Sequence, residues 1–223
     1  MSDARSAILS TVSATLAHRR GGQPAPAPAS IAAEAAALAM RAYATRPDRG
    51  AGSLDAAFLA RVISPAVSAT AERVAVLRDF PDAVRRYLTA HGLAASVALQ
   101  PHPDLGALDW SGVEMHDRIG LDEPVAVGLA RGGIAETGSL VFHSAPGSPT
   151  LFAFLPVHHI VAVAADRIWS GLEDYADAFA GTAQPRNVNL ITGASGTTDI
   201  EGTLVRGAHG PGHLHVVLIG GMG

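Results

Sequence analysis

The side chains best suited to chemistry lie in the last third of the chain, between closely spaced glycines. Hydroxyls, two carboxylates and a histidine follow one another there as Ser195, Thr198, Asp199, Glu201 and His209. Hydroxyls and exposed backbone amides suit an anion such as a carboxylate or a phosphate, above all where a helix begins. A carboxylate of this stretch could act as a general base or a covalent nucleophile, or could merely cap the start of a helix.

Gly193 precedes this stretch, which follows an expected strand and could open a helix. His209 lies in a glycine- and proline-rich turn, and its imidazole could relay a proton near neutral pH. We assign the catalytic roles here to Glu201 and His209. Ligand contacts are assigned to Gly193, Ser195, Thr198 and Asp199. The spacing of these histidines and carboxylates is not a recognised zinc pattern, so we predict no metal.

A second group of polar residues follows an apolar run at 124–130. Glu136, Thr137, Gly138 and Ser139 lie beside a glycine-rich turn, before another apolar run at 139–143. Because ligands in open α/β sheets collect at the carboxyl ends of strands, Glu136 is a candidate catalytic carboxylate and the other three are candidate ligand contacts. The alternative is that they cap the turn. The glycines do not form G-x-G-x-x-G, so no nicotinamide site is predicted.

His158 and His159 stand side by side in the segment 156–160. On a strand, adjacent side chains point to opposite faces, so the two histidines make a poor metal pair. One of them is expected in the core or in a cleft, and we take His159 as a candidate ligand contact.

The elements that must position these residues alternate between helix and strand. Helices are predicted at 2–20, 31–45, 54–63, 79–92, 149–155 and 166–180, and strands at 65–70, 95–99, 124–130, 139–143, 159–164, 188–191 and 214–219. This alternation predicts an α/β fold with an open, mostly parallel sheet flanked by helices. Residues 1–30 are expected to form an N-terminal helix with a proline-rich linker, and residues 31–223 one domain.

Composition excludes several classes of protein. The chain has 223 residues, a net charge of −4, no cysteine and no lysine. Iron–sulfur clusters held by cysteine, thiolate nucleophiles and Schiff-base lysines are therefore excluded on this chain. The charge gives no basic footprint for nucleic acid, and no apolar run is long enough to span a membrane. With no evident secretory signal, we expect a cytoplasmic protein.

Three segments resemble the LUD domain of the lactate-utilisation protein C type (LutC/YkgG). They are Ile-Ala-Glu-Thr-Gly-Ser-Leu at 134–140, Leu-Pro-Val-His-His at 155–159 and the long stretch from Ser195 to Val216. The resemblance covers residues of about 60–223 and rests most on the third segment. It implies a fold like that of NagB, RpiA and the CoA-transferases, with a ligand cleft at the strand ends.

The resemblance also implies a role in the oxidation of L-lactate to pyruvate, together with partner proteins. One partner would carry iron–sulfur clusters, in keeping with the absence of cysteine here. The chain itself would hold no cofactor and would bind a small carboxylate or a phosphorylated ligand. Two alternatives remain open at this point: a stand-alone transferase or isomerase using Glu201 or Glu136, and a non-catalytic assembly module.

Overall fold

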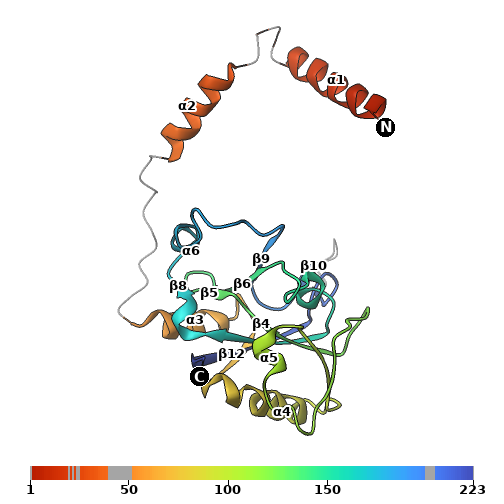
Figure 1. Cartoon of the computed structure of the whole chain (residues 1–223), viewed down its shortest axis with the longest axis vertical. Helices are drawn as coiled ribbons and strands as arrows, with labels where there is room; N and C mark the ends of the chain where they lie inside the picture. The colour runs from red at the N-terminus through yellow and green to blue at the C-terminus, as the bar shows by residue number, and fades with distance from the viewer. Residues whose placement is uncertain are drawn as a thin grey trace. The chain divides into compact units, whose positions relative to one another are not determined.

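The structure of the protein, a computed structural model, describes residues 2–19, 21, 23, 26–39, 52–198 and 204–222. The chain divides into two compact units, residues 1–47 and 48–223. In the first unit, α1 spans Ser2–Arg19 and α2 spans Pro28–Ala39 (Figure 1). Both helices were predicted, and α2 begins three residues earlier than its pattern indicated, with a proline in its first turn. None of the described helices is long and apolar enough to cross a membrane.

The second unit is built on a six-stranded sheet in which every pair of neighbours is parallel. Its strands lie in the order β1 (Thr70–Val76), β12 (His213–Gly221), β7 (His158–Ala164), β4 (Val125–Leu129), β2 (Ser96–Leu99) and β3 (Glu114–His116). The central strands β12, β7 and β4 are almost wholly apolar and buried, as strands covered on both faces must be. The predicted open parallel α/β fold is confirmed.

Helices and a second, smaller sheet cover the two faces of the parallel sheet. The helices of this unit are α3 (Leu54–Val62), α4 (Phe80–Ala90), α5 (Pro103–Gly106) and α6 (Leu172–Ala178), with short 3-10 turns at Leu77–Asp79, Thr150–Ala153 and Ala165–Arg167. α4 and α5 pack on one face, whereas α3 and the smaller sheet pack on the other. Alternate residues of β7 therefore enter different cores: Ile160 faces α4, and Val161 faces α3.

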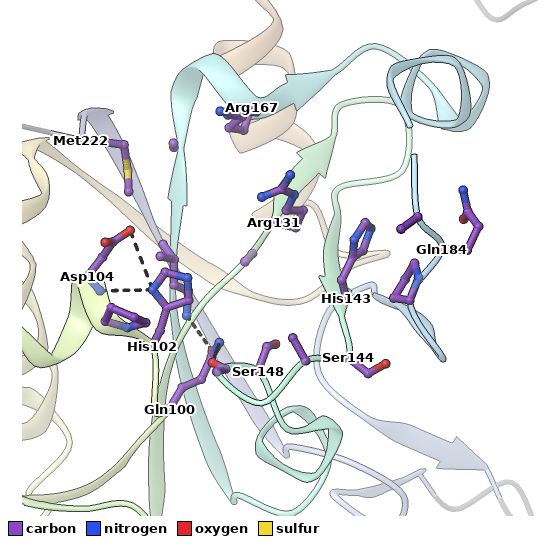
Figure 2. A pocket seen from close by; sticks show the side chains of 18 residues that line it. Gln100, His102, Asp104, Arg131, His143, Ser144, Ser148, Arg167, Gln184 and Met222 are labelled. Atoms are coloured by element: carbon purple, nitrogen blue, oxygen red, sulfur yellow. Dashed lines mark hydrogen bonds and ion pairs between the residues drawn. The ribbon is translucent and has the colours of Figure 1, made fainter. Parts of the chain in front are cut away.

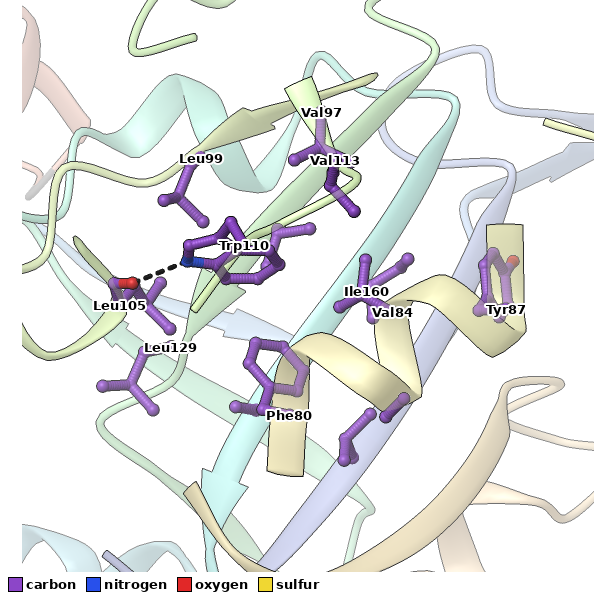
Figure 3. Packing of buried hydrophobic residues seen from close by; sticks show 14 of the residues in the cluster. Phe80, Val84, Tyr87, Val97, Leu99, Leu105, Trp110, Val113, Leu129 and Ile160 are labelled. Atoms are coloured by element: carbon purple, nitrogen blue, oxygen red, sulfur yellow. Dashed lines mark hydrogen bonds between the residues drawn. The ribbon is translucent and has the colours of Figure 1, made fainter. Parts of the chain in front are cut away.

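The core beneath α4 shows why this segment is a helix (Figure 3). Phe80, Val84 and Tyr87 recur at helical spacing and are buried against the sheet. The ring of Phe80 meets Trp110 edge to face, with 6.1 Å between ring centroids. The Trp110 indole N–H donates to the carbonyl of Leu105 at 2.8 Å, so this large side chain is buried without losing a hydrogen bond.

Three segments differ from the sequence-based prediction. Residues 65–67 form a turn held by hydrogen bonds to the Ser64 carbonyl, and the strand begins only at Thr70. The predicted helix at 166–180 begins only at Leu172, because residues 168–169 form the short strand β8 instead. Its partner β5 (Gly132–Ile134) lies in what was predicted to be a turn.

The smaller sheet contains four strands in the order β8 (Ile168–Trp169), β5, β6 (Ser139–His143) and β9 (Val188–Ile191). β9 was predicted as part of the parallel sheet, and this was wrong. It pairs antiparallel with β6, with Leu140 opposite Ile191 and His143 opposite Val188. Ser139 begins β6 and His143 ends it, so these two polar residues lie at opposite ends of the strand.

Candidate functional site

A cleft of about 550 Å³ opens at the carboxyl ends of four neighbouring strands, β2, β4, β7 and β12 (Figure 2). This is the edge of an open parallel sheet at which ligands bind. The residues that contribute polar groups are Gln100, His102, Asp104, Arg131, His143, Ser144, Ser148, Arg167 and Gln184. They come from loops far apart in sequence, which the sheet brings together.

Two arginines give the cleft its charge. Arg131 follows β4 by two residues, and Arg167 follows β7 by three. Across the described residues, neither guanidinium has a carboxylate partner. Arg131 lies over the ring of Phe179 at 5.3 Å from its centroid, which holds the side chain in place without neutralising it. An anion in the cleft would therefore meet two positive charges that no carboxylate of the described residues pairs.

His143, at the end of β6, forms the next part of the wall. A 2.8 Å hydrogen bond joins its Nε2 to the hydroxyl of Tyr175 on α6. Burial, with a smaller contribution from the positive charge of Arg131, lowers the pKa of His143. The imidazole is thus neutral at pH 7, and a neutral imidazole can accept a proton from a bound ligand.

Gln100 forms the floor of the cleft and is fixed at both ends of its amide. Its Oε1 accepts from the Leu129 N–H at 2.9 Å, and its Nε2 donates to the Gly147 carbonyl at 3.0 Å. Gly128 lies below it, where an added Cβ would come within 2.8 Å of Gln100 Oε1 and 3.1 Å of His159 Nε2. Only glycine leaves room for both side chains at this point.

His159 is therefore part of the layer beneath the cleft and does not line it. The imidazole is 1% exposed, and neither ring nitrogen has a hydrogen-bond partner among the described residues. Burial lowers the pKa of His159 to about 3, so the ring is neutral. Its neighbour His158 points to the other face of the sheet, as the strand pattern predicted.

Residues 137–139, predicted as ligand contacts, lie at the opposite end of β6 from the cleft. The Thr137 hydroxyl bonds that of Ser139 at 2.7 Å, and Ser139 bonds the Thr192 hydroxyl at 2.6 Å. Gly138 packs beside Arg61 of α3. Glu136 is half-buried at the same turn, and its backbone N–H donates to the Ser170 carbonyl at 3.2 Å.

Through its described residues 193–198, the glycine-rich stretch after β9 does not open the helix that the sequence analysis allowed. Gly196–Thr198 is the strand β10, which pairs antiparallel with β11, Leu204–Arg206. Gly193 has φ +81°, and an added Cβ would overlap the Val67 carbonyl oxygen, so the turn after β9 requires glycine at this position. The residues Asp199 and Glu201 lie outside the described part of the chain.

Ser195 and His209 are brought together on this hairpin. The Ser195 N–H donates to the Pro211 carbonyl at 2.7 Å, and the His209 N–H lies 3.4 Å from Ser195 Oγ. The Ser139–Thr192 bond joins the first motif segment to this loop, and the pairing of His213 with His158 joins the second segment to the third. Of the predicted site residues that the structure describes in these segments, none lines the cleft.

The sequence analysis did not identify a cluster of four histidines around Tyr87, hereafter the histidine cluster. It contains His91, His158, His213 and His215. Two of these begin adjacent parallel strands, with His213 directly opposite His158. The sequence held one signal of this cluster. Strands were expected to begin near His158 and near His213, and parallel neighbours that begin at these residues place the two histidines at the same edge of the sheet.

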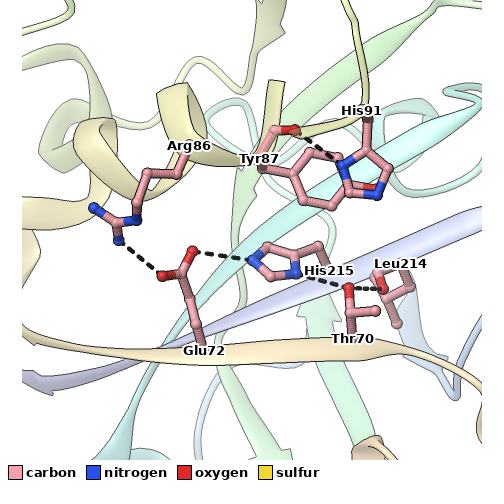
Figure 4. Close-up of polar contacts among 7 residues, drawn as sticks. All are labelled: Thr70, Glu72, Arg86, Tyr87, His91, Leu214 and His215. Carbon is pink, nitrogen blue, oxygen red and sulfur yellow. Dashed lines mark hydrogen bonds and ion pairs between the residues drawn. The ribbon is translucent and has the colours of Figure 1, made fainter. Parts of the chain in front are cut away.

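The cluster satisfies most of its own polar atoms. Tyr87 OH bonds His158 Nδ1 at 2.9 Å, and the rings of His158 and His213 stack with centroids 4.3 Å apart. His215 Nδ1 bonds the Thr70 hydroxyl at 2.7 Å and its Nε2 lies 3.2 Å from Glu72, which also pairs with Arg86 (Figure 4). In the part of the chain that the structure describes, no three His, Asp or Glu side chains are placed to hold a metal ion.

The fold and the cleft define an α/β protein with a cleft lined by two arginines at the carboxyl edge of a parallel sheet. Residues 118–219 match the family model of the LUD domain. The match includes all three motif segments, so this part of the chain is similar to the LUD domain, as those segments indicated.

Individual relatives show the same similarity. The uncharacterised protein NMB1437 of Neisseria meningitidis is 34% identical over 92 residues, 40% of either chain. Lactate utilization protein C of an Exiguobacterium species is 28% identical over 119 residues, 50% of this chain and 52% of its own length. The chain thus matches about half the length of these relatives or less. The crystal structure of a DUF162 family protein from Deinococcus radiodurans has the same fold, with a TM-score of 0.52 and 20% identity over 75% of this chain and 96% of that one.

Proposed function

We propose that this chain is a component of an L-lactate utilisation system and binds a small carboxylate, such as lactate or pyruvate, in the cleft. The observation that carries the proposal is the pair of arginines, Arg131 and Arg167, whose charges no carboxylate of the described residues balances. The name of the Exiguobacterium relative supports the pathway. Guanidinium groups recognise carboxylates through charge-assisted hydrogen bonds, the strongest kind available to a protein.

The proposed role divides the reaction between two chains. Oxidation of lactate to pyruvate releases two electrons and two protons. With no cysteine in this chain, clusters that accept the electrons are ligated by a partner protein. His143, held neutral by burial, is suited to take the proton of the substrate hydroxyl.

The loops that carry the family motifs form a second candidate region. Ser139, Thr192 and Thr137 form a continuous chain of hydroxyls, and Ser195 lies beside His209. We propose that this region, with Glu136, Asp199 and Glu201, contributes to catalysis or to contact with the partner. If Glu136→Gln and Glu201→Gln together leave lactate-dependent growth intact, these loops have no catalytic role.

Isothermal titration of the full chain with L-lactate and with pyruvate tests the proposal. The double variant Arg131→Gln with Arg167→Gln should weaken binding at least about tenfold, since each hydrogen bond to a charged group contributes about 1.5–3 kcal/mol. The matched control, Arg73→Gln with Arg78→Gln, removes the same charge from exposed residues that do not line the cleft, and should change the affinity less than about twofold.

Two results would overturn the proposal. Unchanged affinity in the Arg131 and Arg167 double variant would place the ligand elsewhere. Failure of the wild type to bind any carboxylate, combined with co-purification of an iron-containing partner, would favour the assembly-module alternative. Co-purification with the tagged full chain therefore accompanies the titration.

A further inference from the structure

A second hollow adjoins the cleft and makes it much larger than a three-carbon acid requires. Its volume is about 660 Å³, and it shares Gln100, His102 and Pro103 with the cleft. The other residues that line it are Leu99, Pro101, Gly106, Met115, His116 and Asp117, at the carboxyl ends of β2 and β3. Pockets of about 300–1,000 Å³ typically hold molecules of drug size, so either hollow alone exceeds the needs of lactate.

The lining of the second hollow combines apolar surface with hydrogen-bonding groups. Met115 is 46% exposed, and a thioether makes favourable contacts with aromatic rings. Beside it, the His116 ring is held in place, with Nδ1 2.7 Å from the Arg118 carbonyl and Nε2 3.4 Å from Glu123. The held ring of His116 and the adjacent thioether of Met115 offer a surface for a planar ring, whereas a purely apolar chain would leave the polar rim unpaired.

Charge is distributed unequally along the combined groove. Arg131, Arg167 and the exposed carboxylate of Asp104 line the first cleft, with Asp104 next to the residues that the two hollows share, whereas the exposed carboxylate of Asp117 lines the second hollow. His102 stands between, 3.8 Å from Asp104. A ligand that follows the groove must be anionic at one end only, and should present hydrogen-bond donors at the other.

We propose that the combined groove binds a nucleoside phosphate. The phosphate contacts Arg131 and Arg167, the sugar hydroxyls and the base contact the carboxylates, and the base lies on Met115 and His116. This inference rests on the anion-binding role proposed above for the two arginines, and adds to it a second ligand-binding surface with its own residues.

Titration of the full chain with AMP, inorganic phosphate, adenosine and L-lactate provides the test. AMP should bind at least about tenfold more tightly than inorganic phosphate, because the nucleoside adds contacts in the second hollow. Met115→Glu introduces a negative charge there at an exposed position, and should weaken AMP about tenfold while leaving inorganic phosphate unchanged. Leu121→Glu, at a residue that is 86% exposed and lines neither hollow, is the matched control.

The outcomes separate this inference from the proposed function. If lactate binds and depends on the arginines, but AMP binds no more tightly than phosphate, the nucleoside inference fails alone. If AMP binds and responds to Met115→Glu whereas no carboxylate binds, the proposed lactate site fails and the inference stands. If AMP binds equally well to wild type and Met115→Glu, the base lies elsewhere and the inference is overturned.

Discussion

At the carboxyl edge of the parallel sheet, Arg131 and Arg167 carry charges that no carboxylate of the described residues balances. Near the amino edge, by contrast, Glu72 lies between Arg86 and His215, and Tyr87 bonds His158. Both regions are rich in basic side chains on neighbouring strands. The difference is that the histidine cluster pairs most of its polar atoms internally, whereas the cleft leaves two guanidinium groups without a carboxylate partner among the described residues. Function is therefore expected at the first edge and stability at the second.

The largest effect expected at the amino edge comes from Tyr87→Ala. Tyr87 is 6% exposed and its ring contacts three histidines, so its truncation should cost about 3–5 kcal/mol of unfolding free energy. Urea denaturation measures this. Tyr87→Phe keeps the ring and loses only the bond to His158, and should cost about 1 kcal/mol. If Tyr87→Ala instead remains stable but loses carboxylate binding, the two edges are coupled and the contrast between them is wrong.

The contrast also explains which parts of the structure were predictable. The strand at 214–219 and the helix beginning at Phe80 have strong local patterns, because their apolar residues face a core. β1 was missed because it lies at the edge of the sheet, where Glu72 and Arg73 interrupt the apolar pattern. The helix predicted through Trp169 was wrong because that residue pairs with β5, a contact that local sequence does not reveal.

The site was predictable only in part. Among the described motif residues, Ser139 contacts Thr192 and Ser195 contacts His209, and these residues were found because glycines and hydroxyls lie close together in the sequence. Arg131 and Arg167 belong to no motif and are 36 residues apart in the sequence. Each follows a strand that was predicted correctly, so the rule that ligands bind at strand ends could have selected them. Only the structure could show that neither arginine has an ion-pair partner among the described residues.

The pH dependence of the free energy of unfolding should reveal the lowered pKa values of the buried imidazoles. The folded state keeps His159 neutral down to a pKa of about 3, whereas an unfolded chain protonates it near its ordinary value of 6.5. Burial, with His213 and His91 nearby, lowers the pKa of His158 to about 4. The unfolded state therefore binds more protons between these values, and stability should fall as the pH falls below 6.5, by about 1.4 kcal/mol per pH unit for each fully buried imidazole.

Denaturation midpoints measured at pH 7.5 and at pH 5.0 check this expectation. Equal stability at the two values would mean that His159 is protonated in the folded protein or has access to water. Either result would contradict the buried, neutral state described here.

A smaller effect on stability is expected from His159→Leu. Both ring nitrogens are buried without a partner among the described residues, so replacing the ring by an apolar side chain of similar volume should stabilise the protein by about 1–2 kcal/mol. The variant should also show a weaker loss of stability below pH 6.5 than the wild type. Destabilisation together with loss of ligand binding would show that His159 contacts a ligand or a bound water, as the sequence analysis proposed.

The smallest expected effect concerns the contact that holds the Arg131 side chain in the cleft. Phe179 contacts the Arg131 guanidinium at 5.3 Å, and such a contact is worth about 0.5–1 kcal/mol at an exposed site. Phe179→Leu should therefore lower the affinity for a carboxylate about two- to fivefold, and should also lower stability because the ring packs on Trp169 and Tyr175. Leu172→Ala, at a residue of the preceding helix α6 that is 49% exposed, serves as the control and should leave binding unchanged. An unaltered affinity in Phe179→Leu would mean that the contact with Phe179 does not help Arg131 to bind a ligand, and that the Phe179 ring contributes only to packing.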